Sequence, residues 1–460
     1  MYSLLNKLNT LVWGIPTISL ILGTGLYFTV KTGFCQFMRF PYAVRSFFEK
    51  LKPDKNQSGS VSPYQALCTA LAATVGTGNI AGVAGAISLG GPGSVFWMWI
   101  CAFLGMVIKC AEATLAVKYR IKSPSGEFYG GPMIIIDRGL GSKWRWLGTT
   151  YAIFGIVAAF GVGNATQINA VLSGIHSVAS GFGMSVSQSV DISVALCLAV
   201  LICIMISGGA KRIGRIAEML VPFAAVIYII LGAGVLVCRS AVIPSAFSSI
   251  FIGAFSPNAV TGGVIGSMFI ACRIGAARGV FTNEAGMGTA SIAHASADVN
   301  HPAEQGLLGI IEVFLDTVVI CTVTALVILC SGIHIPYGTD TGASLTADAF
   351  SSVYGSWVSV LITACLICFA VATVIGWGFY GMRCAQYLFG GKVWRIFVLL
   401  QAVTVVFSAF LHTGTVWTLA EIVNGLMAVP ALFFPRLFGG ISGRDPADFF
   451  EECGRTHQLK

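Results

Sequence analysis

Apolar residues fill eleven long runs of this chain, separated by charged residues or by Gly/Pro-rich breaks. A run of about 20 apolar residues is long enough to cross the hydrocarbon core of a bilayer as a helix. The pattern therefore predicts an all-α integral membrane protein with about 11 transmembrane helices. The expected spans lie near residues 11–30, 63–90, 94–117, 147–178, 187–208, 216–238, 258–290, 305–331, 356–382, 396–411 and 414–435.

The second span is interrupted near its centre by the sequence Gly76-Thr77-Gly78-Asn79. Each glycine costs about 1 kcal/mol relative to alanine in a helix, so this is where the helix most easily breaks. In lipid the freed N–H and C=O groups need partners. Broken membrane helices of transporters bind small charged solutes and ions at such places. We therefore predict that this break holds a substrate and a cation.

Two other interpretations of this stretch are weaker. GTGNIAG resembles a dinucleotide fingerprint, but its third glycine, Gly82, comes one residue late and no strand precedes the motif. Tight helix packing is an alternative, because Gly78 and Gly82, like Gly82 and Ala86, form small-xxx-small pairs. Packing leaves Thr77 and Asn79 at bilayer depth unexplained.

Composition agrees with a polytopic membrane protein. Only 10% of the 460 residues are charged and the mean hydropathy is +0.83, whereas soluble domains carry about 25% charged residues. The net charge of +8 is scattered between spans, which argues against nucleic-acid binding. The fourteen cysteines show no paired spacing and predict neither disulfides nor a zinc site. No small-residue cleavage site follows the first span, so we expect no removed signal peptide.

The basic residues predict the orientation. If the loop after the first span is cytoplasmic, that side receives 22 of the 27 Lys and Arg residues. The positive-inside rule then places the N-terminus outside and the C-terminus in the cytoplasm. We expect a multi-pass protein of the plasma membrane, the inner membrane of a bacterium.

The seventh span is the second unusual one. It contains Gly275, Gly279, Gly286 and Gly288, and it begins from the side opposite to the second span, five spans earlier. This is the relation that an inverted repeat of five helices requires. We predict a single transporter domain over 1–460. It comprises an extra N-terminal helix in 1–35, repeats of five helices in 63–238 and 258–435, and a cytoplasmic tail in 436–460.

Several long motifs also resemble one known family. ATVGTGNIAGVAGAI, GGPGSVFWMW followed by KCAEATLAVKYR, GGPM, and RGVFTNEAGMGTASIAHA are similar to sequences of the alanine or glycine:cation symporters. The resemblance covers essentially the whole chain. It implies a leucine-transporter-type fold of ten core helices after one additional N-terminal helix. It also implies symport of small neutral amino acids (alanine, D-alanine, glycine) with Na⁺ or, in some members, H⁺, and no chemistry on the substrate.

A zwitterionic amino acid needs donors for its carboxylate and acceptors for its ammonium group. The N–H groups freed at Gly76, Thr77 and Gly78 suit the carboxylate, because the N-terminus of a half-helix favours negative charge. Carbonyls freed in the seventh span, from Ile270 to Ile274, are expected to accept from the ammonium group.

Two further substrate contacts rest partly on the resemblance. Gln167 matches a glutamine that the family keeps on the substrate, although a hydrogen bond between helices would also explain it. Trp377 is expected to wall the side-chain pocket, although a single tryptophan in a membrane helix can simply be packing.

The resemblance also implies two Na⁺ sites. The first uses Asn79 and the carbonyl of Thr74. The second joins carbonyls of Ala72 and Val75 to the ninth span, with the Ala370 carbonyl and the Thr373 hydroxyl. Family members often have serine where this chain has Ala372. If that serine is a ligand, the second site has one oxygen ligand fewer in this chain. Weaker Na⁺ coupling, or coupling to H⁺ in place of Na⁺, then becomes the alternative. No resident cofactor is implied.

Charged residues inside the spans are costly in lipid and are expected to face the protein interior. We expect Arg278 and Glu284 to pair near the cytoplasmic half of the seventh span and to act in gating. Glu312 and Asp316 are spaced i,i+4, which fits a proton relay or, as we favour, a structural role. For Glu112 and Arg273 we also favour a structural role.

Other functions fit less well. A channel needs polar residues along several helices, and outside the two broken spans the runs are mainly apolar. A membrane enzyme needs convergent catalytic groups, and no nucleotide-binding motif supports a primary pump. We therefore predict a secondary symporter that works by alternating access, whose partners are a small neutral amino acid, Na⁺ or H⁺, and the lipid bilayer. We expect a monomer.

Overall fold

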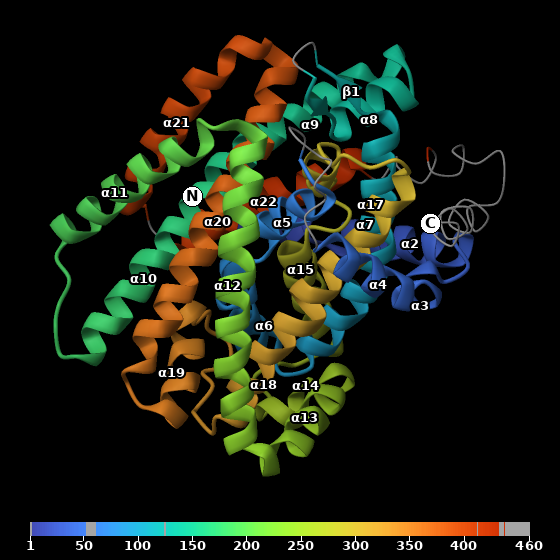
Figure 1. Cartoon of the computed structure of the whole chain (residues 1–460). Coiled ribbons are helices and arrows are strands. Elements are labelled where there is room, and N and C mark those ends of the chain that lie inside the picture. Colours follow the sequence, from blue (N-terminus) through green and yellow to red (C-terminus); the bar gives the residue numbers. More distant parts are fainter. Residues whose placement is uncertain (1, 52–60, 124–125, 412, 432–436, 438–460) are drawn as a thin grey trace.

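The apolar runs form helices in the computed structural model of the chain, which describes residues 2–51, 61–123, 126–411, 413–431 and 437 (Figure 1). Among the described residues, eight helices are long and apolar enough to span a bilayer, or nine if one bent pair counts as a single span. Four single helices of the described chain span by themselves: α7 (Ser94–Tyr119), α11 (Gln188–Ile206), α12 (Gly209–Cys238) and α20 (Val358–Phe389). Helix α2 (Ile15–Lys31) belongs to the span Lys7–Lys31, and α21 (Trp394–Phe407) belongs to the span Gly391–Phe410.

The two expected spans missing from this count are the seventh and the last. In 258–290 the longest helix is α15 (Met268–Asn283), with 16 residues. In 414–435 the helix is α22 (Thr413–Ala431), and only Thr418–Ala428 appears there as a shorter apolar helix. The predicted tail 436–460 lies outside the described residues except for residue 437.

The bent pair is the span that carries the glycine break. Helix α5 (Pro63–Thr74) and the turn η1 (Thr77–Asn79) with α6 (Ala81–Gly90) meet at an angle of 57°. Ser62 and Gln65 form a capping box that fixes the start of α5. The break predicted from Gly76 and Gly78 is therefore confirmed in position.

The helix of the seventh span is also interrupted, but the interruption does not lie at Ile270 to Ile274, where free carbonyls were expected. Helix α15 is continuous through Ile270 and Ile274, and the next helix, α16, covers Ala290–His294. Between them Glu284, Gly286 and Gly288 have positive φ angles of 54°, 87° and 77°. Because helical carbonyls are already hydrogen-bonded, the expectation that those of Ile270 to Ile274 are free is wrong.

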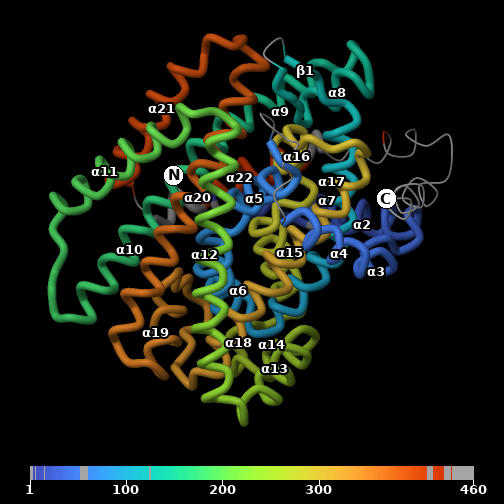
Figure 2. Tube along the Cα trace, in the orientation of Figure 1, coloured from blue at the N-terminus to red at the C-terminus, as the bar shows by residue number. Residues whose placement is uncertain are grey.

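Two helical rods surround the broken helices. One is α9 (Arg145–Ala158), the π-helical segment η3 (Ala159–Ala165) and α10 (Thr166–Gly181), which packs on α20. The other is α17 (Pro302–Val313), the π-helical segment η5 (Phe314–Cys321) and α18 (Thr322–Cys330), whose α17 packs on α7. Figure 2 shows α5 and α15 in the middle of the molecule, with α10 and α20 on one side and α7 and α17 on the other.

Shorter elements account for the other secondary structure of the described residues. The strands β1 (Ile121–Lys122) and β2 (Phe128–Tyr129) form one antiparallel pair. The remaining helices are α1 (Tyr2–Val12), α3 (Cys35–Met38), α4 (Phe40–Lys50), α8 (Pro132–Gly139), α13 (Ile243–Phe255), α14 (Pro257–Thr261) and α19 (Gly342–Tyr354), with 3₁₀ turns η2 (Ser142–Trp144), η4 (Ser240–Val242), η6 (Gly391–Val393) and η7 (Ser408–Phe410).

Candidate functional site

The break between α5 and α6 leaves backbone groups without backbone partners. Among the described residues, no hydrogen bond ends on the carbonyls of Ala72, Thr74 or Val75, and none starts from the N–H groups of Thr77 or Gly78. All of these residues are buried. Since buried polar backbone groups are nearly always paired in proteins, this break can accept a ligand with both acceptor and donor groups.

Three elements converge at Gly76. A Cβ atom added there would lie 2.5 Å from the hydroxyl Oγ1 of Thr373 on α20 and 3.5 Å from the amide Oε1 of Gln167 on α10. Within the part of the chain that the structure describes, both of these oxygens and Oγ1 of Thr77 are buried without a hydrogen-bond partner. The Gln167 amide nitrogen donates to the Val162 carbonyl at 3.2 Å, so its oxygen is left for another group.

Trp377 lies one turn after Thr373 on α20 and is fully buried. It packs against η3, where a Cβ atom on Gly163 would come within 2.4 Å of the tryptophan Cβ. Its ring meets that of Tyr380 edge to face, with the centroids 5.8 Å apart. The structure thus puts Trp377 on the same face of α20 as Thr373, and its role as a pocket wall stays a prediction.

The two broken spans touch at the C-terminal end of α15. A Cβ atom on Gly78 would lie 2.8 Å from Cγ2 of Thr282 and 3.7 Å from Cδ1 of Phe281. Ile274 is instead next to Gly90 at the far end of α6. Phe281 and Thr282 therefore line the break where Ile270 and Ile274 were expected. The signal in the sequence was their position directly before the turn that begins at Glu284.

Asn79 is held by both the broken helix and η5. Its Oδ1 accepts a hydrogen bond of 2.9 Å from the Gly76 N–H. Its amide nitrogen donates to Oδ1 of Asp316 at 2.7 Å and to the Asp316 carbonyl at 3.1 Å. The Asn79 carbonyl accepts from the Thr324 hydroxyl at 2.8 Å. Asn79 thus turns its amide oxygen toward the break, where a cation would need an oxygen ligand.

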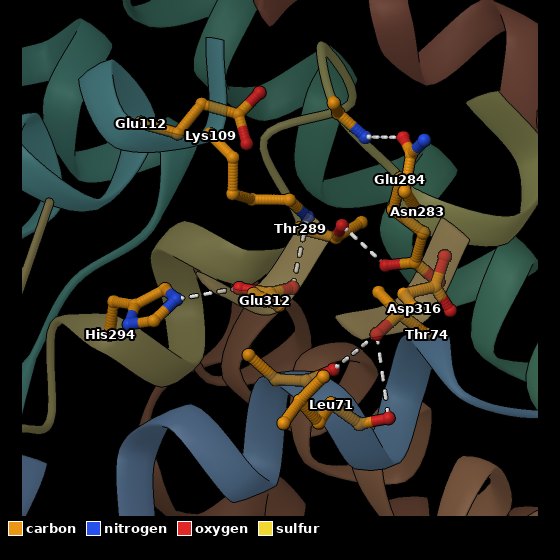
Figure 3. A network of polar contacts seen from close by, with 12 residues as sticks. Leu71, Thr74, Lys109, Glu112, Asn283, Glu284, Thr289, His294, Glu312 and Asp316 are labelled. Atoms are coloured by element: carbon orange, nitrogen blue, oxygen red, sulfur yellow. Dashed lines mark hydrogen bonds and ion pairs between the residues drawn. The ribbon is translucent and has the colours of Figure 1, made fainter. Parts of the chain in front are cut away.

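A second group of buried charges holds the break in the seventh span (Figure 3). The Glu312 carboxylate lies between the Lys109 ammonium, at 3.2 Å, and the His294 ring, at 2.9 Å. Glu112 accepts hydrogen bonds from the N–H groups of Gly286, at 2.9 Å, and Gly288, at 3.0 Å. Glu312 and Asp316 therefore have different partners, Lys109 and His294 for Glu312 and Asn79 for Asp316, which argues against a shared relay.

Lys109→Met is expected to destabilise the protein strongly. Both side chains of the Lys109–Glu312 pair are fully buried, and removing one partner of such a pair typically costs about 3–5 kcal/mol. Thermal unfolding of the purified variant would measure this loss. Lys50→Met is the matched control, because the Lys50–Glu304 pair is partly exposed and is worth about 1 kcal/mol or less. Equal losses in the two variants would contradict the structural role of Lys109.

The expected Arg278–Glu284 pair does not form. Arg278 makes ion pairs of 3.2 Å with Asp340, in the segment after α18, and with Glu421 on α22. Glu284 accepts instead from the Thr289 hydroxyl at 2.6 Å. Arg278 also lies beside Gly85 of α6, in the half of the membrane predicted to face outward. From the sequence we predicted that Arg278 lies in the cytoplasmic half of the membrane. With the N-terminus outside, as predicted, Arg278 lies in the outer half instead, so that placement is wrong.

The opposite end of the broken spans is also closed. The Asp298 N–H donates to the Val61 carbonyl at 2.9 Å, which joins the start of α5 to the segment after α16. Arg120, at the end of α7, donates to the carbonyls of Ala297 and Val299. Contacts therefore join the chain segments at both ends of the broken spans, and the residues at the break between them are buried.

This geometry agrees with comparisons to known proteins. A model of the sodium:alanine symporter family matches residues 1–457. The chain belongs to the sodium:alanine symporter family. This confirms the resemblance of its motifs, and it makes the chain a multi-pass membrane transporter and not an enzyme.

Relatives and a solved structure give the same result. The chain is 43% identical to the sodium/alanine symporter AgcS of Methanococcus maripaludis, over 95% of each chain. It is 36% identical to the amino-acid carrier protein AlsT of Bacillus subtilis, over 98% of this chain and 92% of that one. The crystal structure of MhsT with L-phenylalanine superimposes with a TM-score of 0.63 at 14% identity, covering 85% of this chain and 92% of that chain. The leucine-transporter-type fold is thereby confirmed.

Proposed function

We propose that this protein imports small neutral amino acids, alanine, D-alanine or glycine, together with Na⁺ across the bacterial inner membrane. The observation that carries the proposal is the set of buried oxygens without partners on Thr77, Gln167 and Thr373 around the freed backbone at Gly76. The free N–H groups suit a carboxylate, and the oxygens suit an ammonium group or a hard cation. The names of the relatives AgcS and AlsT support the same substrate class.

The cation ligands that we propose fall into two groups beside the break. Asn79 and the Thr74 carbonyl would form the first site, next to the substrate carboxylate. The second would use the carbonyls of Ala72, Val75 and Ala370 with the Thr373 hydroxyl, and α5 and α20 do approach closely there, since a Cβ atom on Gly376 would lie 2.9 Å from the Ala73 nitrogen. Proton coupling is the alternative, because Ala372 supplies no hydroxyl.

Alternating access would open the two closed ends in turn. Opening outward requires separation of Arg278 from Asp340 and Glu421, and opening inward requires separation of Val61 from Asp298. We propose that Arg278 gates the outer end together with these two acids. The role of Glu284, whose partner is Thr289, is to shape the turn after α15 and not to pair with Arg278. We also propose that the core helices form an inverted repeat of five plus five helices. We further propose that the protein is a monomer whose N-terminus lies outside.

Trp377→Ala is expected to widen the range of substrates. The buried indole fills space on the Thr373 face of α20, and its removal leaves a cavity that a larger aliphatic side chain can occupy. In the unmodified protein, leucine and phenylalanine should not compete with labelled alanine. In the variant, leucine should compete. A profile unchanged by the substitution would remove Trp377 from the pocket.

Uptake into proteoliposomes tests the proposed substrate class. Labelled alanine should accumulate when an inward Na⁺ gradient is imposed, and unlabelled alanine, D-alanine, glycine and serine should be compared as competitors. Saturable uptake that small neutral amino acids inhibit supports the proposal. Uptake that does not saturate would indicate a channel, and inhibition by phenylalanine would contradict the small pocket.

A further inference from the structure

The carboxylate of Asp316 lies beside the proposed cation site and is the subject of a further inference, which rests on the proposed function. We infer that Asp316 is the positioning residue of that site: it orients the Asn79 amide and supplies the negative charge that complements the transported cation.

The hydrogen bonds of Asp316 determine the orientation of Asn79. An amide nitrogen only donates and a carboxylate or carbonyl oxygen only accepts, so the nitrogen of Asn79 must face Asp316, at 2.7 Å from Oδ1 and 3.1 Å from the carbonyl. The amide oxygen consequently faces the Gly76 N–H at 2.9 Å. A carbonyl-type oxygen has two lone pairs, so the second remains for a cation at the break.

The same network provides a hydrogen-bond donor for each side-chain oxygen of Asp316. Its Oδ2 accepts from the Thr317 hydroxyl at 2.7 Å, and that hydroxyl oxygen in turn accepts from the Asn283 amide at 3.1 Å. The single hydroxyl proton of Thr317 is therefore directed at the carboxylate. Both side-chain oxygens of Asp316 therefore accept hydrogen bonds, one from Asn79 and one from Thr317.

Asp316 has no basic partner of its own. It is fully buried, yet among the ion pairs of the described residues none includes it, whereas the equally buried Glu312 has Lys109 and His294. A buried charge without a counter-charge is strongly destabilising. A cation bound beside Asn79 would provide the missing positive charge, and oxygen ligands are what a hard cation such as Na⁺ prefers.

The network also connects the two helix breaks. It runs from the Gly76 N–H through Asn79, Asp316 and Thr317 to Asn283, whose Oδ1 accepts from the Ala285 N–H at 3.0 Å. Charge neutralisation at Asp316 therefore acts on hydrogen bonds that hold both broken spans. This explains how one bound cation can order the substrate site in α5–α6 and the facing turn after α15.

Asp316→Asn tests the inference, because asparagine removes the charge and keeps one oxygen that can accept from the Asn79 amide. The full-length protein in nanodiscs is titrated with labelled alanine at fixed pH while choline replaces Na⁺. We expect the half-saturating Na⁺ concentration to rise by about 10-fold or more, with alanine affinity at saturating Na⁺ little changed. Asp191→Asn is the matched control, since Asp191 lies on the far helix α11 and pairs with the exposed His176 of α10; its Na⁺ dependence should equal that of the unmodified protein.

The outcomes separate this inference from the proposed function. If the unmodified protein binds alanine independently of Na⁺, the proposed sodium coupling is overturned. If the unmodified protein depends on Na⁺ and Asp316→Asn depends on it equally, only the role of Asp316 is overturned. Should Asp316→Asn fail to fold, Asp316→Glu decides: the displaced charge should change the preference between Na⁺ and Li⁺, and an unchanged preference would overturn the inference.

Discussion

Gly76→Leu is expected to abolish transport while the protein still inserts and folds. The first atom of the new side chain would lie 2.5 Å from the Thr373 hydroxyl and 3.5 Å from the Gln167 amide oxygen, so the leucine occupies the place where these groups converge. A displacement of about 1 Å at such a site can lower a rate about 100-fold, and a larger loss is expected here. Uptake of labelled alanine and binding to the purified protein would measure it.

Gly82→Ala is the matched control for this variant. Gly82 lies on α6 of the same broken span, and a Cβ atom there meets nothing within 4 Å. Alanine also favours the helix over glycine, so uptake by Gly82→Ala should equal that of the unmodified protein. Normal uptake by Gly76→Leu would remove the substrate site from this break.

Asn79→Ala is expected to abolish most of the coupling between cation and substrate. The Asn79 oxygen is shared between the Gly76 N–H, at 2.9 Å, and the proposed cation site. Coupling between two ligands is reciprocal and typically 1–3 kcal/mol, so Na⁺ should tighten alanine binding roughly 5- to 150-fold in the unmodified protein. The variant should show little of this effect in calorimetric titrations with and without Na⁺.

Asn169→Ala separates this effect from a general loss of a buried amide. Asn169 is also buried, and it donates to the carbonyls of Ala165 and Ser408 at 3.0 Å, away from the break. Its removal should lower thermal stability while Na⁺ still tightens alanine binding. If Asn79→Ala keeps the full effect of Na⁺, the first cation site does not use Asn79.

The first break could be predicted from the sequence because its cause is local. Gly76 and Gly78 place two weak helix formers on either side of one threonine, and the chain does leave the helix there. The convergence of Gln167 and Thr373 on Gly76 was not visible in the spacing of residues. These two came from the family resemblance, and the fold then brought them to the same place.

The second break shows where local reasoning fails. Four glycines marked the seventh span, but two of them, Gly275 and Gly279, lie within α15 and face α7. A Cβ atom on Gly275 would lie 2.3 Å from the Ser94 carbonyl oxygen, and one on Gly279 would lie 3.2 Å from Cβ of Cys101. These glycines allow close packing of helices. Gly286 and Gly288 have positive φ angles and produce the actual turn. Sequence alone does not distinguish a packing glycine from one that breaks a helix.

Long-range ion pairs were the other part that the sequence could not provide. Arg278 and Glu284 are six residues apart, and side chains at this spacing do not share a helix face. The partners of Arg278 are Asp340 and Glu421, 62 residues or more away in the chain. Likewise Asp316 was judged by its spacing from Glu312, whereas its partner is Asn79, 237 residues away.

Transport driven by a sodium gradient is the most direct test of the central claim, that the break at Gly76 binds an amino acid together with Na⁺. Proteoliposomes containing the unmodified protein would receive an inward Na⁺ gradient at equal pH on both sides or, separately, an inward H⁺ gradient without Na⁺. We expect the Na⁺ gradient to accumulate alanine and the H⁺ gradient alone to give none. Equal alanine affinity in sodium and choline buffers, with accumulation that follows only the pH gradient, would contradict sodium coupling and assign the coupling to protons.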